Sequence, residues 1–400
     1  MAYDAAAPAT PLDDVHGLAV RYLRQWAVAP PEGGHRCDPG IPVLAHLVAD
    51  DRAAPAAVAV WSRTAGRGPS RPALYDGGLA GTLVGLHLGS RVHSGLRPVA
   101  DRLRAHLSGR LPPYRTHAVT FPDYDLICGP AGTLLALCAG ETAGRPDFAR
   151  LRPLAAHLAL LCDADDLPRL RTGHYADHPY LSWVHGRVNT GMGHGVAGVV
   201  TALTAALRRT GADPDPDATG DLAAALDRAR RWLVRQSYVD DRGIRTWPGA
   251  GLDRPPAPRA HPRQAWCYGT PGVAWALWDA ADALGDSAGA RWAAAAFTSL
   301  AEHYDETFHL YGDTPADRLG LCHGAAGVLA VADAFDRHAR LPAAAVLKKR
   351  LVAHLTARLA RPAPADWPAD LLTGLPGVLA ALLTAARGAP RAWLPCLGLR

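Results

Sequence analysis

Two kinds of apolar pattern alternate along the chain. Six segments begin with Gly-x-x-Gly and continue as runs that are apolar on nearly every side, as in GVLAALLTAA at residues 377–386. Other segments are amphipathic, with apolar residues at i, i+3, i+4 and i+7, at 99–111, 221–237 and 343–360. A helix that is apolar all round belongs in the interior, whereas an amphipathic helix turns one face to water. The pattern therefore predicts paired inner and outer helices.

The spacing of the glycine pairs predicts how these helices are arranged. The first glycines are Gly78, Gly129, Gly195, Gly269, Gly324 and Gly374. The intervals between them have room for two helices and their loops, and such a repeat signals a repetitive fold. Strand patterns are weak. We therefore expect an all-α fold, an α/α toroid of about six or seven helix pairs.

The beginning of the chain extends this picture. Residues 13–28 predict a further helix, so we expect residues 1–60 to be an N-terminal helical segment of the toroid and residues 61–400 to be its main body. Glycine permits positive φ and lets neighbouring backbone approach closely. Because all inner helices of a ring begin at one end, residues before each Gly-x-x-Gly should face one central cavity. Asp76 is expected to cap a helix start.

Composition narrows the class of protein. Apolar residues make up 49% of the 400 residues and charged residues 20%, which is typical of a soluble globular protein. The net charge of +5 comes without a basic block, which argues against strong nucleic-acid binding. No apolar run reaches the roughly 18 residues that a membrane span needs. With seven cysteines and no signal-peptide pattern at the start, we expect reduced thiols and a cytoplasmic protein.

Side chains that can bind a metal or transfer a proton lie at equivalent positions in four repeats. Cys267 precedes the fourth glycine pair, and Cys322 and His323 precede the fifth. This soft S/S/N set suits Zn²⁺, and three protein ligands leave one tetrahedral position open, as in catalytic zinc sites. The spacing matches no compact zinc motif, so two buried cysteines and a chance histidine are the alternative. The matching repeat positions favour the metal.

Four motifs carry a resemblance to a known family. They are YDLICGPAG at 124–132, NTGMGHGVAG at 189–198, WCYGTPG at 266–272 and CHGAAG at 322–327. Together they resemble the lanthionine synthetase C family, the LanC cyclases, over nearly the whole chain. The resemblance implies an α/α toroid with a central Zn²⁺ held by Cys267, Cys322 and His323. It further implies the following active-site positions: Asp125, His194 and Arg263, with Trp266 and Tyr268 flanking the first zinc cysteine.

The resemblance also implies an activity. LanC-type cyclases add peptide cysteine thiols to dehydroalanine or dehydrobutyrine and so close thioether rings. The implied partners are a dehydrated precursor peptide, leader plus core, and a separate dehydratase. Zinc would deprotonate the thiol, Arg263 would stabilise an enolate, and His194 would act as general acid. Asp125 would orient His194 or join the proton transfer, and Tyr268 could donate a hydrogen bond.

Other interpretations stay open at this point. One is a LanC-like protein that adds glutathione to dehydroamino acids, and another is a non-catalytic scaffold that binds peptide or glutathione around a structural zinc. A toroid glycosidase would need two carboxylates facing the sugar, and the central positions offer only Asp125. We expect Cys128 to be a packing residue, His185 and His261 to be plain loop residues, and the Pro-rich 253–262 to form a loop over the cavity mouth.

Overall fold

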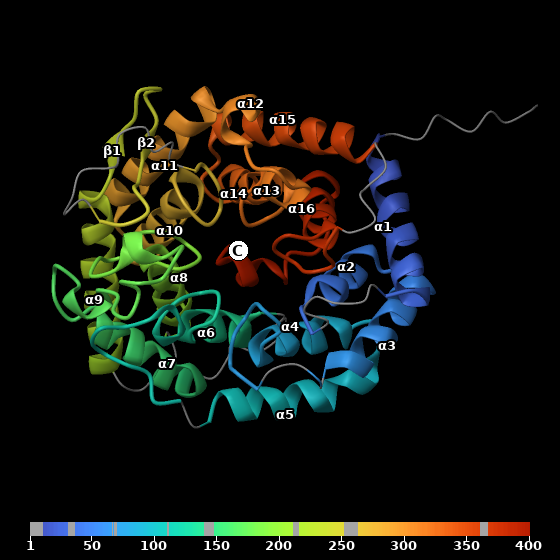
Figure 1. Cartoon of the computed structure of the whole chain (residues 1–400), viewed down its shortest axis with the longest axis horizontal. Coiled ribbons are helices and arrows are strands. Elements are labelled where there is room, and N and C mark those ends of the chain that lie inside the picture. Colours follow the sequence, from blue (N-terminus) through green and yellow to red (C-terminus); the bar gives the residue numbers. More distant parts are fainter. Residues whose placement is uncertain are drawn as a thin grey trace, which may run out of the picture.

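The computed structural model describes residues 11–30, 37–65, 67, 70–109, 112–139, 148–210, 216–251, 263–360 and 367–400. Helices in this part of the chain form two concentric rings (Figure 1). The expected α/α toroid is therefore confirmed.

The inner ring consists of helices that are mostly buried; every residue of α2 and of α6 is buried. The inner helices are α2 (Gly40–Val48), α4 (Leu79–Gly89), α6 (Pro130–Cys138), α8 (Val196–Leu207), α10 (Thr270–Ala283), α14 (Ala325–His338) and α16 (Leu375–Arg387). Each contacts the next, and α16 contacts α2, so the ring closes. The six predicted inner helices are confirmed, and α2 is an additional one.

The outer ring covers the inner one with amphipathic helices (Figure 1). Its members are α1 (Pro11–Val28), α3 (Ala53–Ala65), α5 (Arg97–Leu107), α7 (Phe148–Leu161), α9 (Pro216–Arg235), α11 (Ser287–His303) and α15 (Pro342–Leu359). The first of these is the helix expected at residues 13–28. It contacts α2, α3 and α16, while the expected boundary at residue 60 falls inside α3.

Shorter elements lie between the pairs. They are α12 (Glu306–His309), α13 (Pro315–Leu319), the antiparallel strands β1 (Tyr238–Val239) and β2 (Arg245–Thr246), and the 3₁₀ turns η1 (Ser94–Leu96), η2 (Phe121–Asp123), η3 (Pro168–Leu170), η4 (Ser182–Val184) and η5 (Leu394–Leu397). None of the described helices is long and apolar enough to cross a membrane. The seven cysteines all lie in this part of the chain as free thiols.

The glycine pairs act by allowing close approach. In each of the six copies, a Cβ added to the second glycine would lie 1.9 to 2.4 Å from a carbonyl oxygen of the preceding loop. Among the first glycines, Gly269 alone has a positive φ, 82°. The glycines therefore seat each loop directly against the helix that follows it. Asp76 does not cap α4, which begins after Gly78 without a side-chain cap, so that expectation is wrong.

A belt of backbone hydrogen bonds joins these loops from repeat to repeat. The bonds run from Cys322 N–H to Leu372 O, from Cys267 N–H to Cys322 O, from Met192 N–H to Cys267 O, from Leu126 N–H to Gly193 O and from Tyr75 N–H to Ile127 O, at 2.8 to 3.3 Å. Asp38 links the first and last repeats, because its buried carboxylate accepts the N–H of Leu371 at 2.7 Å. The belt holds the backbones of both predicted zinc cysteines.

The C-terminal residues fill the middle of the ring (Figure 1). Their carbonyl oxygens accept hydrogen bonds from three inner side chains: Tyr75 to Cys396, Trp266 to Leu397 and Trp275 to Gly398, at 2.6 to 2.9 Å. Each donor is a buried ring that would otherwise lose its hydrogen bond to water. The C-terminal segment is therefore packed against the inner helices in the middle of the toroid.

Candidate metal centre and active site

The predicted metal ligands come together in the structure. Cys267 lies in the loop before α10, and Cys322 and His323 lie in the loop before α14. Their Sγ and imidazole nitrogen atoms are all within 4.8 Å of one another. Cys267 is buried, whereas Cys322 and His323 are half-buried. Solvent therefore reaches the set through Cys322 and His323.

The electrostatics of this cluster suit a cation. The hydrogen bond that Cys322 makes with Cys267, together with burial, raises the pKa of the Cys322 thiol well above its ordinary value. Two adjacent sulfurs cannot both ionise unless a positive charge lies between them. Two thiolates and an imidazole are soft and borderline donors of the kind that Zn²⁺ prefers. The residues present therefore fit the metal.

An acidic residue faces the far side of the histidine. His323 Nε2 is 3.7 Å from Cys322 Sγ, and its Nδ1 is 3.9 Å from Asp317 Oδ1. Asp317 belongs to α13, where its other oxygen accepts a hydrogen bond from the Thr314 hydroxyl at 2.8 Å. Metal-binding histidines commonly present their second nitrogen to a carboxylate. Sequence analysis missed Asp317, since no motif marks it.

His194 and Asp125 form a second group. His194 Nδ1 lies 2.5 Å from Asp125 Oδ2, and Asp125 is completely buried. The other carboxylate oxygen accepts the N–H of Cys128 at 2.8 Å. Phe121 stacks on the His194 ring with centroids 4.5 Å apart. The imidazole is thus held on its Nδ1 side and against one face, which leaves Nε2 as the nitrogen available to a substrate.

Cys128 contributes more than packing to this group. Its half-buried Sγ lies 3.7 Å from Asp125 Oδ2. Burial and the neighbouring carboxylate raise the pKa of this thiol strongly, so it remains protonated and donates to Asp125. The same oxygen therefore accepts from both Cys128 and His194.

Tyr268 and Trp266 lie in different surroundings. The Tyr268 hydroxyl accepts a hydrogen bond from Asn189 Nδ2 at 2.9 Å, so its own proton is free to be donated. Burial raises the pKa of Tyr268 and keeps it protonated. Trp266 is fully buried and bonds to the C-terminal segment. Trp266 is thus a packing residue of the site wall. Asn189, the first residue of the NTG motif, holds the Tyr268 hydroxyl, a role that the sequence analysis did not assign.

Arg263 is held beside the potential metal ligands. Its guanidinium carbon lies 4.2 Å from the centroid of the Tyr311 ring, and the Tyr311 carbonyl accepts its N–H at 3.5 Å. The hydrogen bond with Cys322 raises the pKa of His323, and the nearby charge of Arg263 opposes that rise. Tyr311 was not foreseen, because it lies in the segment between α12 and α13 that departs from the repeat.

The two groups are joined through one loop. Met192 donates its N–H to Cys267 O at 2.8 Å, and a Cβ on Gly193 would lie 3.6 Å from Cys267 Cβ. His194 follows directly. His185 lies exposed in the loop between α7 and α8, whereas His261 and the Pro-rich 253–262 lie outside the described residues.

This fold and this site define a helical toroid with a cluster of potential metal ligands among the loops at one end. The family model described as "Lanthionine synthetase C-like protein" matches residues 69–397. The chain belongs to that family, and the resemblance seen in its motifs is confirmed. Among solved structures, nisin cyclase superposes with a TM-score of 0.74 over 96% of this chain and 97% of that chain, at 17% identity. That likeness concerns the fold. Comparison with curated protein sequences finds no match.

Proposed function

We propose that this protein is a zinc-dependent lanthipeptide cyclase. Its substrate is a dehydrated precursor peptide, leader plus core, supplied in the cytoplasm by a separate dehydratase. The reaction adds a peptide cysteine thiol to dehydroalanine or dehydrobutyrine and forms a lanthionine or methyllanthionine ring. The observation that carries the proposal is the S/S/N cluster of Cys267, Cys322 and His323 in a chain of this family.

The metal would be held by these three side chains. When bound, zinc supplies a positive charge that lowers the pKa of an incoming thiol, so that the nucleophile is present at neutral pH. The open side of the cluster is where the half-buried Cys322 and His323 meet solvent. Arg263 lies near His323, and Tyr268 lies near Cys267 and Cys322.

The chain's own residues can complete the addition. The sulfur forms a bond to Cβ of the dehydro residue, and the electron pair of the double bond moves to the carbonyl oxygen as an enolate. Arg263, a permanent cation steadied by Tyr311, lies close enough to the cluster to stabilise that charge. The proton of the Tyr268 hydroxyl is available for the same oxygen.

The enolate must then take a proton at Cα. We assign this proton transfer to His194 Nε2, because Nδ1 is engaged by Asp125. Since Asp125 is completely buried, we assign it an orienting role instead of direct proton transfer to the substrate. The proton that the thiol loses balances the one that Cα gains, so no oxidant or reductant is needed.

The test compares zinc content and ring closure in Cys322→Ala and in Cys162→Ala, which alters a buried thiol at the end of α7. We expect about one zinc per chain in the wild type and the control and none in Cys322→Ala. Ring closure, followed as loss of alkylatable thiol in a dehydrated peptide, should fall about 100-fold or more without the ligand. Absence of zinc from the reduced wild type would refute the proposal. Transfer of glutathione in place of ring closure would favour the glutathione-adding alternative.

A further inference from the structure

A compact loop between α7 and α8 stands beside the candidate site. Its ends are tied together, because Thr172 N–H donates to Arg187 O at 3.0 Å and Gly186 N–H donates to Thr172 O at 2.8 Å. Surface loops closed in this way frequently carry function. We call residues 172–187 the aromatic loop.

The aromatic loop carries a row of rings that links the two sides of the site. In five neighbouring pairs the ring centroids are 4.5 to 6.4 Å apart. Tyr180 and Trp183 are joined differently, because Trp183 Nε1–H donates to the backbone carbonyl of Tyr180 at 3.0 Å. The row runs from His194 to Phe121, Tyr175, His178 and Tyr180, and then from Trp183 to Tyr268. It therefore begins on the proposed general acid and ends on the residue next to Cys267.

The middle of this row is open to solvent. Tyr180 is 81% exposed and Trp183 is 42% exposed. An exposed tyrosine and an exposed tryptophan in direct contact are unusual on a protein surface and are typical of binding sites. Both rings have few rotatable bonds, so they offer a large contact area at low entropic cost.

We propose that the aromatic loop binds the extended peptide on both sides of its reacting cysteine. This inference rests on the proposed function, which supplies a peptide as the substrate. The row of rings spans the site from the proton donor to the metal ligands, so a chain lying along it keeps its thiol and its dehydro residue near both groups. Dehydroalanine and dehydrobutyrine are planar and conjugated, and planar groups pack well on aromatic faces.

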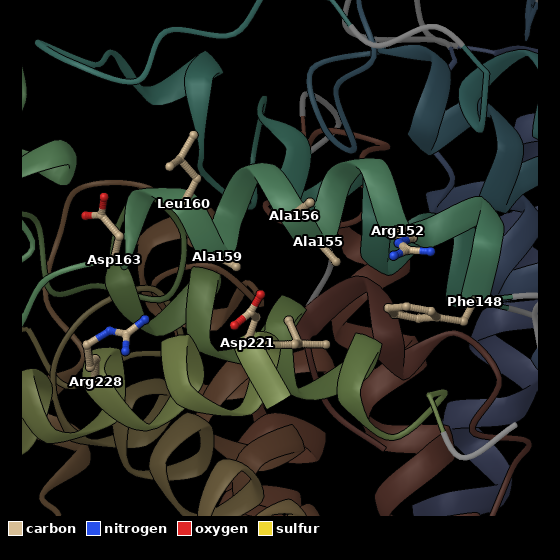
Figure 2. Close-up of a pocket in the computed structure, with 10 residues that line it drawn as sticks. Phe148, Arg152, Ala155, Ala156, Ala159, Leu160, Asp163, Asp221 and Arg228 are labelled. Carbon is tan, nitrogen blue, oxygen red and sulfur yellow. The ribbon is translucent and has the colours of Figure 1, made fainter. Parts of the chain in front are cut away.

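A surface groove away from the aromatic loop serves as the comparison. A groove of about 610 Å³ lies between α7 and α9 on the outer wall, lined among others by Phe148, Leu160 and Asp221 (Figure 2). Leu160 is 44% exposed, close to the value for Trp183. None of the candidate site residues lines this groove, so Leu160→Ala is a matched control.

The experiment measures how binding depends on peptide length. The probes are N-acetylcysteine amide and a nine-residue peptide with one central cysteine and leucines on both sides, titrated into the zinc-loaded full chain by calorimetry. We expect the wild type and Leu160→Ala to bind the peptide at least about tenfold more tightly than the short thiol. Tyr180→Ala and Trp183→Ala should each lose most of that gain while binding the short thiol as the wild type does.

Two outcomes overturn the proposal: a wild type that gains nothing from peptide length, and alanine variants that keep the full gain. Tyr180→Ala is informative even if Trp183→Ala disturbs the loop, because the Tyr180 ring projects into solvent; Tyr180→Phe should restore the gain. The readout is binding, so a failure of the proposed function would appear separately, as a wild type that shows the length gain but closes no ring.

Discussion

Gly327 is the position at which a single methyl group should disturb both halves of the candidate metal site. In Gly327→Ala the new Cβ would lie 2.0 Å from Leu321 O and 2.9 Å from Trp266 Cβ. Leu321 precedes Cys322, and Trp266 precedes Cys267. A Cβ carbon essentially never lies within 3.0 Å of a non-bonded heavy atom, so the loop before α14 must move by about 1 Å.

The expected cost follows from two opposing terms. Overpacking a buried site costs about 3 kcal/mol at the upper end of its usual range, and replacing glycine by alanine in a helix returns about 1 kcal/mol. We therefore expect the free energy of unfolding to fall by about 2 kcal/mol. Zinc affinity should fall as well, because metal ligands tolerate displacements of only about 0.2 Å.

Urea unfolding and chelator competition test this prediction, with Gly220→Ala as the control. Gly220 is exposed in α9, has no atom within 4 Å of an added Cβ and no unusual φ. Its replacement should stabilise the protein by about 0.5 to 1 kcal/mol. If Gly327→Ala matches the wild type in both stability and zinc affinity, close approach is not what this glycine provides.

Two further variants test the closure of the ring and the surroundings of the metal. Asp38→Ala should lower the free energy of unfolding by about 2 kcal/mol, because the buried N–H groups of Gly40 and Leu371 lose their acceptor. Asp38→Asn keeps an acceptor oxygen and serves as the comparison. Burial and the neighbouring Asp370 raise the pKa of Asp38. The protonated Asp38 side chain therefore stabilises the fold fully below about pH 4, and this stabilisation is lost as the pH rises through the folded-state pKa. Urea titrations should therefore show the wild type losing stability relative to Asp38→Asn as the pH rises above about 4, and parallel pH profiles would contradict this. Asp317→Ala should weaken zinc binding about tenfold by freeing His323. Thr314→Ala removes the cap of α13 and one hydrogen bond to Asp317 but keeps the carboxylate, so it should weaken binding less. Equal affinities of the wild type and Asp317→Ala in a chelator competition would argue against a supporting role for Asp317.

The repeat was readable from the sequence where every copy kept both glycines. The seventh inner helix, α2, was missed because no Gly-x-x-Gly marks its start; its Gly40 is the first helical residue, where a Cβ would meet Ala369 O at 2.8 Å. Asp317 and Tyr311 escaped for a different reason. They lie in the segment of α12 and α13 that interrupts the repeat, so no equivalent position pointed to them.

By itself, the sequence determined the ring of helices and the end of the ring where the chemistry lies, because apolar periodicity and glycine spacing are local properties of the chain. It also placed two cysteines and a histidine at matching points of neighbouring repeats. Only the tertiary structure decided which atoms meet. Cys267 and Cys322 are brought together by ring closure and a backbone hydrogen bond between their loops, and Asp125 turns one oxygen to His194 and the other to the backbone. Such contacts depend on how distant segments pack, which no local pattern records.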